Sequence, residues 1–246
     1  MGVLPGDLSP DRDPAEEHPR RFVHGDHLLR LQHGWMNCTP RVWSMSVAGS
    51  TVGAMKTDQL FLLSDAALRE VVDQIDPADF SAPVPKEWSQ LESPTLLGIL
   101  GRHAYDEAWI PDVIAGRAAA DGDPYADADL LGDDPIAAYD ALNDAAGAAV
   151  RSGQFAETFR FTYGDYSASD GFSHLSMYRA FQAWSIAKHF GIPFHLSPEL
   201  IDGLNEHVVP HADEWRQWGV FPPAIEPPAG ADEETRLLCA VGFWVE

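Results

Sequence analysis

The sequence predicts an all-α helical bundle. Four or five segments carry apolar side chains three and four residues apart, the spacing of one helix face, and no segment shows a convincing strand alternation. Most of these segments begin at a capping residue or at a Ser-Pro or Asp-Pro pair, and they end near Gly or Pro. Amphipathic helices without a sheet bury their apolar faces against one another, so a bundle is the expected architecture.

The first two helices are expected over residues 57–75 and 95–116. In the first, Leu60 and Val71 belong to an apolar face, and an Asp-Pro pair follows the last turn. The second begins at a Ser-Pro pair, which places a capping hydroxyl before a Pro in the first turn. Pro111 is expected to kink the second half of this helix, because Pro removes a backbone hydrogen bond.

Three further helices are predicted over residues 134–151, 171–191 and 197–218. The segment 117–133 is an acidic loop, whose Asp spacing lacks the central Gly and the terminal Glu of a calcium-binding EF-hand. Aromatic residues crowd the segment 154–168. A short strand and turn could form there, but the preferred interpretation is an aromatic lid beside the helix that follows.

The charge and the cysteines of the chain exclude several classes of function. With 16 Lys+Arg against 38 Asp+Glu, the net charge is −22, which disfavours binding to nucleic acid or to anionic membranes. Cys38 and Cys239 are far apart and form no CxxC motif, so a disulfide scaffold and a Cys-based zinc site are not expected. No apolar run reaches roughly 18–20 residues and no secretory signal is recognised, so we expect a cytoplasmic location.

The expected domain organisation has three parts. Residues 1–54 combine Pro, Gly, His and charge without periodicity, so we expect a disordered N-terminal extension. Met55 precedes the first helical pattern and is an alternative start of the native chain, which mass spectrometry of the native N-terminus would decide. The bundle is predicted over residues 55–225, and the Pro-rich residues 226–246 are expected to form an extended C-terminal tail.

The helix over 171–191 carries the candidate functional residues. At about 100° per residue, one sector roughly 80° wide holds a polar stripe: His174, Tyr178, Gln182, Ser185 and His189. Large apolar residues flank this stripe, which is typical of a face that lines a pocket or meets another helix. On the helix over 95–116, His103 and Glu107 lie one turn apart and could share a divalent ion, although a hydrogen-bonded core histidine is the more frequent arrangement.

Three segments resemble the DinB-like superfamily, in particular actinobacterial proteins similar to the N-terminal domain of mycothiol-dependent maleylpyruvate isomerase: LLGILGRHAYDEAWIPDVIAG, YRAFQAWSIAKHFG and VVPHADEWRQWGVFPPAI. The resemblance covers residues 56–225 and implies a DinB-like four-helix bundle with an additional C-terminal helix. It also implies a divalent metal, zinc or nickel, held by three side chains. His103 matches the family's first ligand, whereas the other two positions fall on Tyr178 and Gln182, and Ser185 replaces the family's Asp.

Two functions follow from the resemblance. The first is a metal-dependent isomerase or transferase that acts on a small molecule with a thiol such as mycothiol as cofactor. Its expected metal ligands are His103, His174 and Gln182, while Tyr178 would polarise a substrate carbonyl and Arg179 would pair with a substrate carboxylate. The alternative is a non-catalytic relative that binds a small molecule or forms a homodimer. Neutral Tyr and Gln are poor zinc ligands, and this favours the alternative.

Overall fold

Helices dominate the part of the chain that this computed structural model describes, which is residues 55–89, 91–118 and 122–243. The all-α prediction is confirmed in its coarse form, because long helices pack together and one small sheet accompanies them. The predicted N-terminal extension over residues 1–54 lies outside the described residues. No helix in the described ranges is both long and apolar enough to cross a membrane.

The first three helices follow the sequence prediction closely, and they are α2 (Thr57–Val72), α3 (Leu96–Ile114) and α4 (Pro135–Arg151). Thr95 caps α3 by accepting a hydrogen bond from the amide of Gly98, so the cap lies two residues after the expected Ser93. Asp134 caps α4 as its Asp-Pro pair predicts. Between α2 and α3, two short 3-10 turns, η1 (Pro77–Asp79) and η2 (Lys86–Trp88), interrupt the Pro-rich connection.

The long helix α5 (Ala168–Phe190) is the predicted 171–191 helix, extended by three residues at its start. Ser167 caps it by accepting a hydrogen bond from the amide of Asp170. Gly191 ends it in the left-handed conformation with a φ of 68°, which Gly adopts without a steric cost. The capping signals in the sequence therefore identify both ends to within a few residues.

A β-hairpin precedes α5, which corrects the preferred interpretation of residues 154–168 as an aromatic lid without strands. Its strands are β1 (Thr158–Phe161) and β2 (Gly164–Ser167), paired antiparallel with Phe159 opposite Tyr166. Phe159 is fully buried against Phe172 of α5, at 5.0 Å between ring centres. With four residues a strand, the alternation was too short to be distinguished from aromatic crowding.

The C-terminal region differs from the prediction in two places. The helix expected over 197–218 is divided into α6 (Pro198–His207), a 3-10 turn η4 (Val209–His211) and α7 (Ala212–Gln217), because Pro210 cannot continue a regular α-helix. The extended tail expected over 226–246 contains a helix, α8 (Glu233–Val241), so that prediction is wrong for these nine residues. Asp232 caps α8, and its buried residues dock on the bundle: Leu237, Leu238, Cys239 and Val241.

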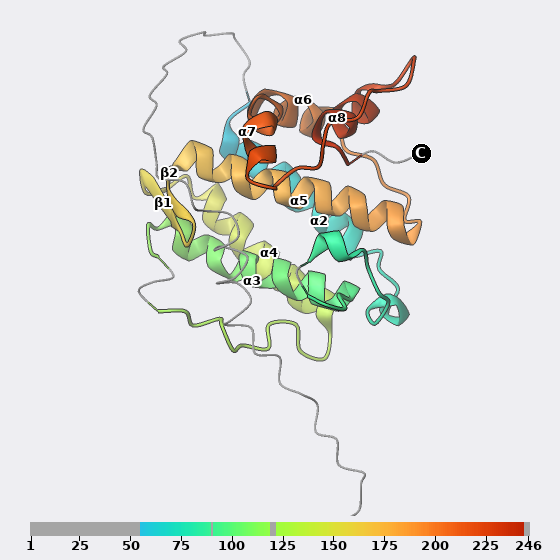
Figure 1. The fold of residues 1–246 in the computed structure, drawn as a ribbon. Coiled ribbons are helices and arrows are strands. Elements are labelled where there is room, and N and C mark those ends of the chain that lie inside the picture. Colours follow the sequence, from blue (N-terminus) through green and yellow to red (C-terminus); the bar gives the residue numbers. More distant parts are fainter. Residues whose placement is uncertain (1–54, 90, 119–121, 244–246) are drawn as a thin grey trace, which may run out of the picture.

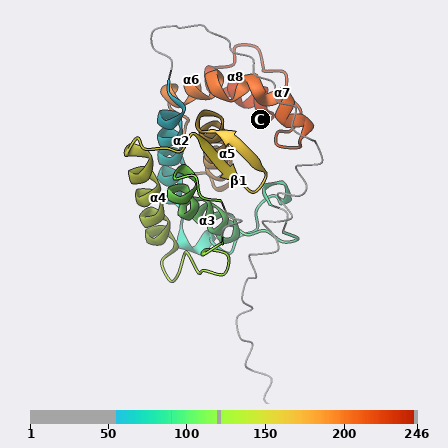
Figure 2. The same ribbon diagram turned by 90° about the vertical axis from the view of Figure 1, so that its left-hand side faces the viewer.

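The helices form layers around α5. In Figure 1, the C-terminal elements α6, α7 and α8 lie on one side of α5, and α3 and α4 lie on the other. Figure 2 shows the same order after a 90° turn. The closest packing joins α2 to α5 and α3 to α4. Both α2 and α5 are therefore central, and residues that they direct inward become fully buried.

Candidate functional site

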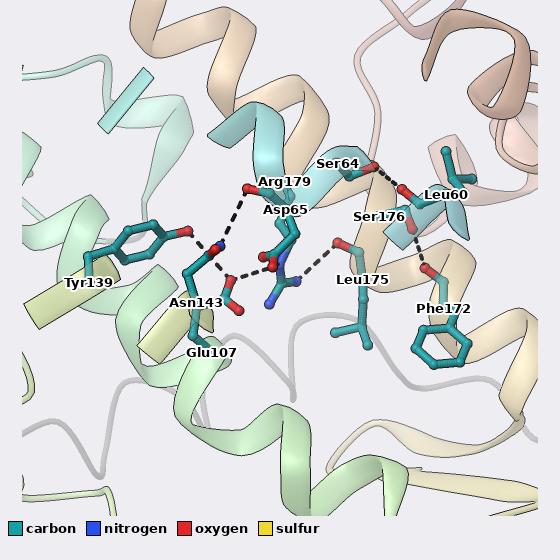
Figure 3. A network of polar contacts seen from close by, with 10 residues as sticks. All are labelled: Leu60, Ser64, Asp65, Glu107, Tyr139, Asn143, Phe172, Leu175, Ser176 and Arg179. Carbon is teal, nitrogen blue, oxygen red and sulfur yellow. Dashed lines mark hydrogen bonds and ion pairs between the residues drawn. The ribbon is translucent and has the colours of Figure 1, made fainter. Parts of the chain in front are cut away.

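Arg179 lies at the centre of a polar network inside the bundle (Figure 3). Its side chain is 0% exposed, and its Nε donates to Glu107 Oε1 at 2.8 Å and to Asp65 Oδ1 at 3.2 Å. Its Nη1 donates to the carbonyl oxygen of Leu175 at 3.1 Å, and Phe61 lies under the guanidinium, 4.9 Å from carbon to ring centre. A single side chain of α5 thus binds acidic residues of both α2 and α3.

The fourth helix of the bundle joins the same network. Tyr139 of α4 donates its hydroxyl proton toward Glu107 Oε1 at 3.5 Å, and the amide of Asn143 donates to the carbonyl oxygen of Asp65 at 3.4 Å. Tyr139 is fully buried, and Asn143 is nearly so. Helices α2, α3, α4 and α5 therefore all contribute to one hydrogen-bonded cluster.

Burial and neighbouring charges shift the pKa values of this cluster. Burial, followed by the negative charge of Glu107, raises the pKa of Asp65 well above its ordinary value. Burial opposes the charge of Arg179, but Glu107 and Asp65 outweigh it and raise the pKa of the guanidinium. The cluster thus sets one guanidinium against two buried carboxyl groups.

The predicted substrate partner Arg179 therefore points inward, where its Nε already binds two carboxyl groups of the chain itself. Asp65 and Glu107 come from positions 114 and 72 residues away. Sequence reasoning did not assign Asp65 any role, since no local pattern indicates a pairing over such a distance.

A second polar group lies where α3 faces α5, and we call it the α3–α5 seam: Arg102, His103 and Asp106 of α3 with Tyr178 and Gln182 of α5. The ring of His103 is 0% exposed and stacks on Tyr178, with ring centres 4.5 Å apart and an interplanar angle of 22°. Arg102 donates to the hydroxyl oxygen of Tyr178, and its guanidinium carbon lies 4.9 Å from the ring centre. The structure thus brings the predicted residues His103 and Tyr178 together.

Several polar atoms of the seam lack hydrogen-bond partners among the described residues. Both ring nitrogens of His103 are buried without a partner, and so is Nε2 of Gln182, which lies one turn after Tyr178 and is 6% exposed. Asp106 forms no hydrogen bond or ion pair within the described ranges. Unpaired buried polar atoms are rare in folded proteins, so their concentration here calls for an explanation.

Burial and charge fix the protonation states in the seam. Burial, with help from the positive charges of Arg102 and Arg179, lowers the pKa of His103 well below its ordinary value, so the ring is neutral. A neutral imidazole offers one N–H donor and one acceptor nitrogen. Burial raises the pKa of Asp106 to about 6, although Arg179 and Arg102 oppose this shift.

His174 occupies a different environment from His103. Its ring packs between Tyr166 of the hairpin and Trp215 of α7, with ring centres 4.6 and 5.1 Å away. Burial lowers the pKa of His174 to about 4, with Asp170 opposing the shift. The aromatic contacts of His174 include none of those that His103 makes, so the structure does not unite the two histidines in one contact group.

These side chains do not fit a tightly bound divalent ion. Within the described residues, no three His, Cys, Asp or Glu side chains are placed to hold a metal ion together. The positive charges of Arg102 and Arg179 disfavour a positive charge on His103. By the same repulsion they oppose a metal cation at that ring. Gln182 and Tyr178 are weak ligands for zinc or nickel. We therefore derive no chemistry through a metal.

A cavity of about 370 Å³ opens between α2 and α4, away from the predicted site residues. Asp65 and Asn143 of the buried network line it. Its other lining residues carry both signs of charge: Leu62, Ala66, Arg69, Glu70, Asp73, Asp144 and Arg151. Arg69 is already paired with Asp140 and Asp144, so its own positive charge is balanced within the chain.

Comparison of the chain with protein-family models, with curated proteins and with solved structures finds no match. Sequence reasoning missed Arg102 and Asp106 in the seam. Their one-turn spacing beside His103 was an available signal, but charged pairs at that spacing are common on solvent-exposed helix faces.

Proposed function

We propose that this protein is a metal-independent relative of the DinB-like bundle proteins that binds a small polar molecule in the α3–α5 seam. The helical bundle and the position of His103 on the second helix of that bundle support the relationship. The unpaired polar atoms around His103 support the location of the site. Binding, rather than a metal-dependent isomerase or transferase reaction, is the activity that these residues fit.

The observation that carries the proposal is the fully buried His103 ring, whose two nitrogens have no partner among the described residues. A buried polar atom without a hydrogen bond costs about 1–3 kcal/mol, so this arrangement destabilises the ligand-free protein. A bound molecule with one acceptor for the imidazole N–H and one donor for the other nitrogen removes that cost. Gln182 adds an amide donor one turn away from the stacked Tyr178.

Other features disfavour the homodimer alternative. Among the described residues, the exposed large apolar side chains are Leu97 and Ile225, with 39% and 37% of their surface accessible. An interface between two copies is normally built on a contiguous apolar patch, which two separate residues do not provide. The polar seam is thus the better candidate for recognition.

A thermal-shift screen tests the proposal. The purified protein is heated with a panel of small polar compounds, including amino acids, nucleobases, organic acids and low-molecular-weight thiols such as mycothiol. We expect at least one compound to raise the Tm of the wild type by several degrees, since a ligand at about 100 times its Kd stabilises a protein by roughly 2.7 kcal/mol.

Matched variants locate the binding. His103→Phe keeps an aromatic ring at this position but removes both nitrogens, and Gln182→Leu removes the amide. Both variants should lose the shift, whereas His195→Phe should keep it because His195 is an exposed residue elsewhere in the fold. A panel without any stabilising compound, or a shift that His103→Phe retains, contradicts the proposal.

A further inference from the structure

We propose that the core of the bundle contains a guanidinium-binding site, formed by Asp65, Glu107, the carbonyl group of Leu175 and the ring of Phe61. Arg179 fills this site from within the chain. The inference concerns a different group of residues from the α3–α5 seam and does not depend on the ligand proposed there.

The contacts around Arg179 engage two of the three guanidinium nitrogens and one face of its plane. Two carboxylate oxygens accept from Nε at 2.8 and 3.2 Å, a carbonyl oxygen accepts from Nη1 at 3.1 Å, and an aromatic face covers the plane at 4.9 Å, while Nη2 has no partner among the described residues. Planar, multiple-donor recognition of this kind distinguishes a guanidinium from an ammonium, which is a point charge. A stacked aromatic ring adds a cation–π attraction.

The charges of the site are those that a divalent ion would otherwise balance. Asp65 and Glu107 are both deeply buried, and an unneutralised pair of carboxylates in that place would be strongly unfavourable. The guanidinium supplies one positive charge beside both groups, and burial raises the pKa of Asp65. The groups are therefore arranged around a flat organic cation, and they do not converge on a single metal-sized point.

Removal of the side chain should leave a site that accepts a free guanidinium ion. Arg179→Ala deletes the cation and leaves the carboxyl groups, which should lower the Tm by about 10 °C, as expected for one broken partner of a buried ion pair. Methylguanidinium at about 1–50 mM, a range below that of general denaturation, is the probe. We expect it to raise the Tm of Arg179→Ala by about 5 °C at saturation.

Two probes and two controls make the result specific. Methylammonium and zinc chloride should restore less than methylguanidinium, because neither has a planar fork of donors. Wild type, whose site is filled, should not be stabilised by the probe. Arg69→Ala should not be stabilised either, since Arg69 makes its ion pairs with Asp140 and Asp144 near the surface.

If Arg179→Ala does not fold by itself, the same titration is followed by the yield of refolded protein in circular dichroism. The triple variant Arg179→Ala, Asp65→Asn, Glu107→Gln keeps the space but removes the charges, and it should not respond to methylguanidinium. The proposal is overturned if methylguanidinium restores neither the Tm nor the refolding yield of Arg179→Ala. It is also overturned if zinc restores them equally well, or if the neutral triple variant responds to the same extent.

Discussion

His174 should make the stability of this protein depend on pH below neutrality. The ring is enclosed by Tyr166 and Trp215, and burial lowers its pKa from 6.5 to about 4. Between these two values the unfolded chain binds a proton that the folded protein excludes. The contribution of the neutral His174 ring to stability is therefore fully present above about pH 6.5 and is lost as the pH falls toward 4. Replacement of His174 by Phe removes this proton uptake and preserves an aromatic ring in the cluster.

The size of the effect follows from the two pKa values. The shift from 6.5 to about 4 spans about 2.5 pKa units, and each unit corresponds to about 1.4 kcal/mol. At pH 4.5 most of that difference is expressed, so the wild type should lose about 2.5 kcal/mol from this group relative to pH 7.5. His174→Phe should avoid the loss. The free energy of unfolding of the variant, measured relative to wild type, should thus rise by about 2.5 kcal/mol as the pH falls from 7.5 to 4.5.

Urea unfolding at pH 4.5, 5.5, 6.5 and 7.5 measures this difference, with linear extrapolation at each pH. His189→Phe is the matched control, because it makes the same replacement at an exposed position near the C-terminal end of α5. If the stabilities of His174→Phe and wild type change in parallel across the four pH values, His174 is not a buried neutral histidine and this explanation is wrong.

Three further predictions concern the seam and the hairpin. Burial raises the pKa of Asp106 from 3.8 to about 6, so the folded protein loses stability as the pH rises through this window and the carboxyl group gives up its proton. Asp106→Asn cannot ionise, so its free energy of unfolding relative to wild type should rise by up to about 3 kcal/mol from pH 4 to pH 7 in urea unfolding. In Gly171→Ala, the new Cβ would lie 2.4 Å from Phe159 Cδ2, and calorimetry should show a loss of about 1–3 kcal/mol. Gly98→Ala, where the nearest atom is 3.5 Å away, is its control and should be neutral or slightly stabilising. His103→Phe should stabilise the ligand-free protein by about 1–3 kcal/mol, because it removes two unpaired buried nitrogens, and a loss of stability would contradict this assignment.

The sequence predicted the long helices because their signals are local. The apolar spacing and the caps of α4 and α5 lie within a few residues of the structure they specify. The same local reasoning missed α8, because the preceding Pro residues suggested an extended tail. Asp232 and the buried pair Leu237 and Leu238 were the available signal, but a helix of nine residues gains most of its stability from docking on the bundle.

The candidate site was only partly predictable. His103 and Tyr178 were expected to belong to one site, and they stack. The roles of Arg102 and Arg179 depend on which helices pack together, and helix spacing does not specify that. Arg179 shares a helix with Tyr178, yet it reaches acidic residues of both α2 and α3, whereas Tyr178 stacks on His103 of α3. An advance of about 100° per residue separates these two environments.

The most direct test of the central claim is the ¹⁵N chemical shift of the His103 imidazole, measured by NMR before and after addition of the compound that the thermal-shift screen identifies. The account predicts a neutral ring at pH 7 in the ligand-free protein, since burial and two arginines lower the pKa of His103 well below its ordinary value. It also predicts that saturating ligand shifts both ring nitrogens, as each gains a hydrogen-bond partner. A ring that titrates near pH 6.5, or nitrogen shifts unchanged by a ligand that binds, would contradict the assignment of this seam as the binding site.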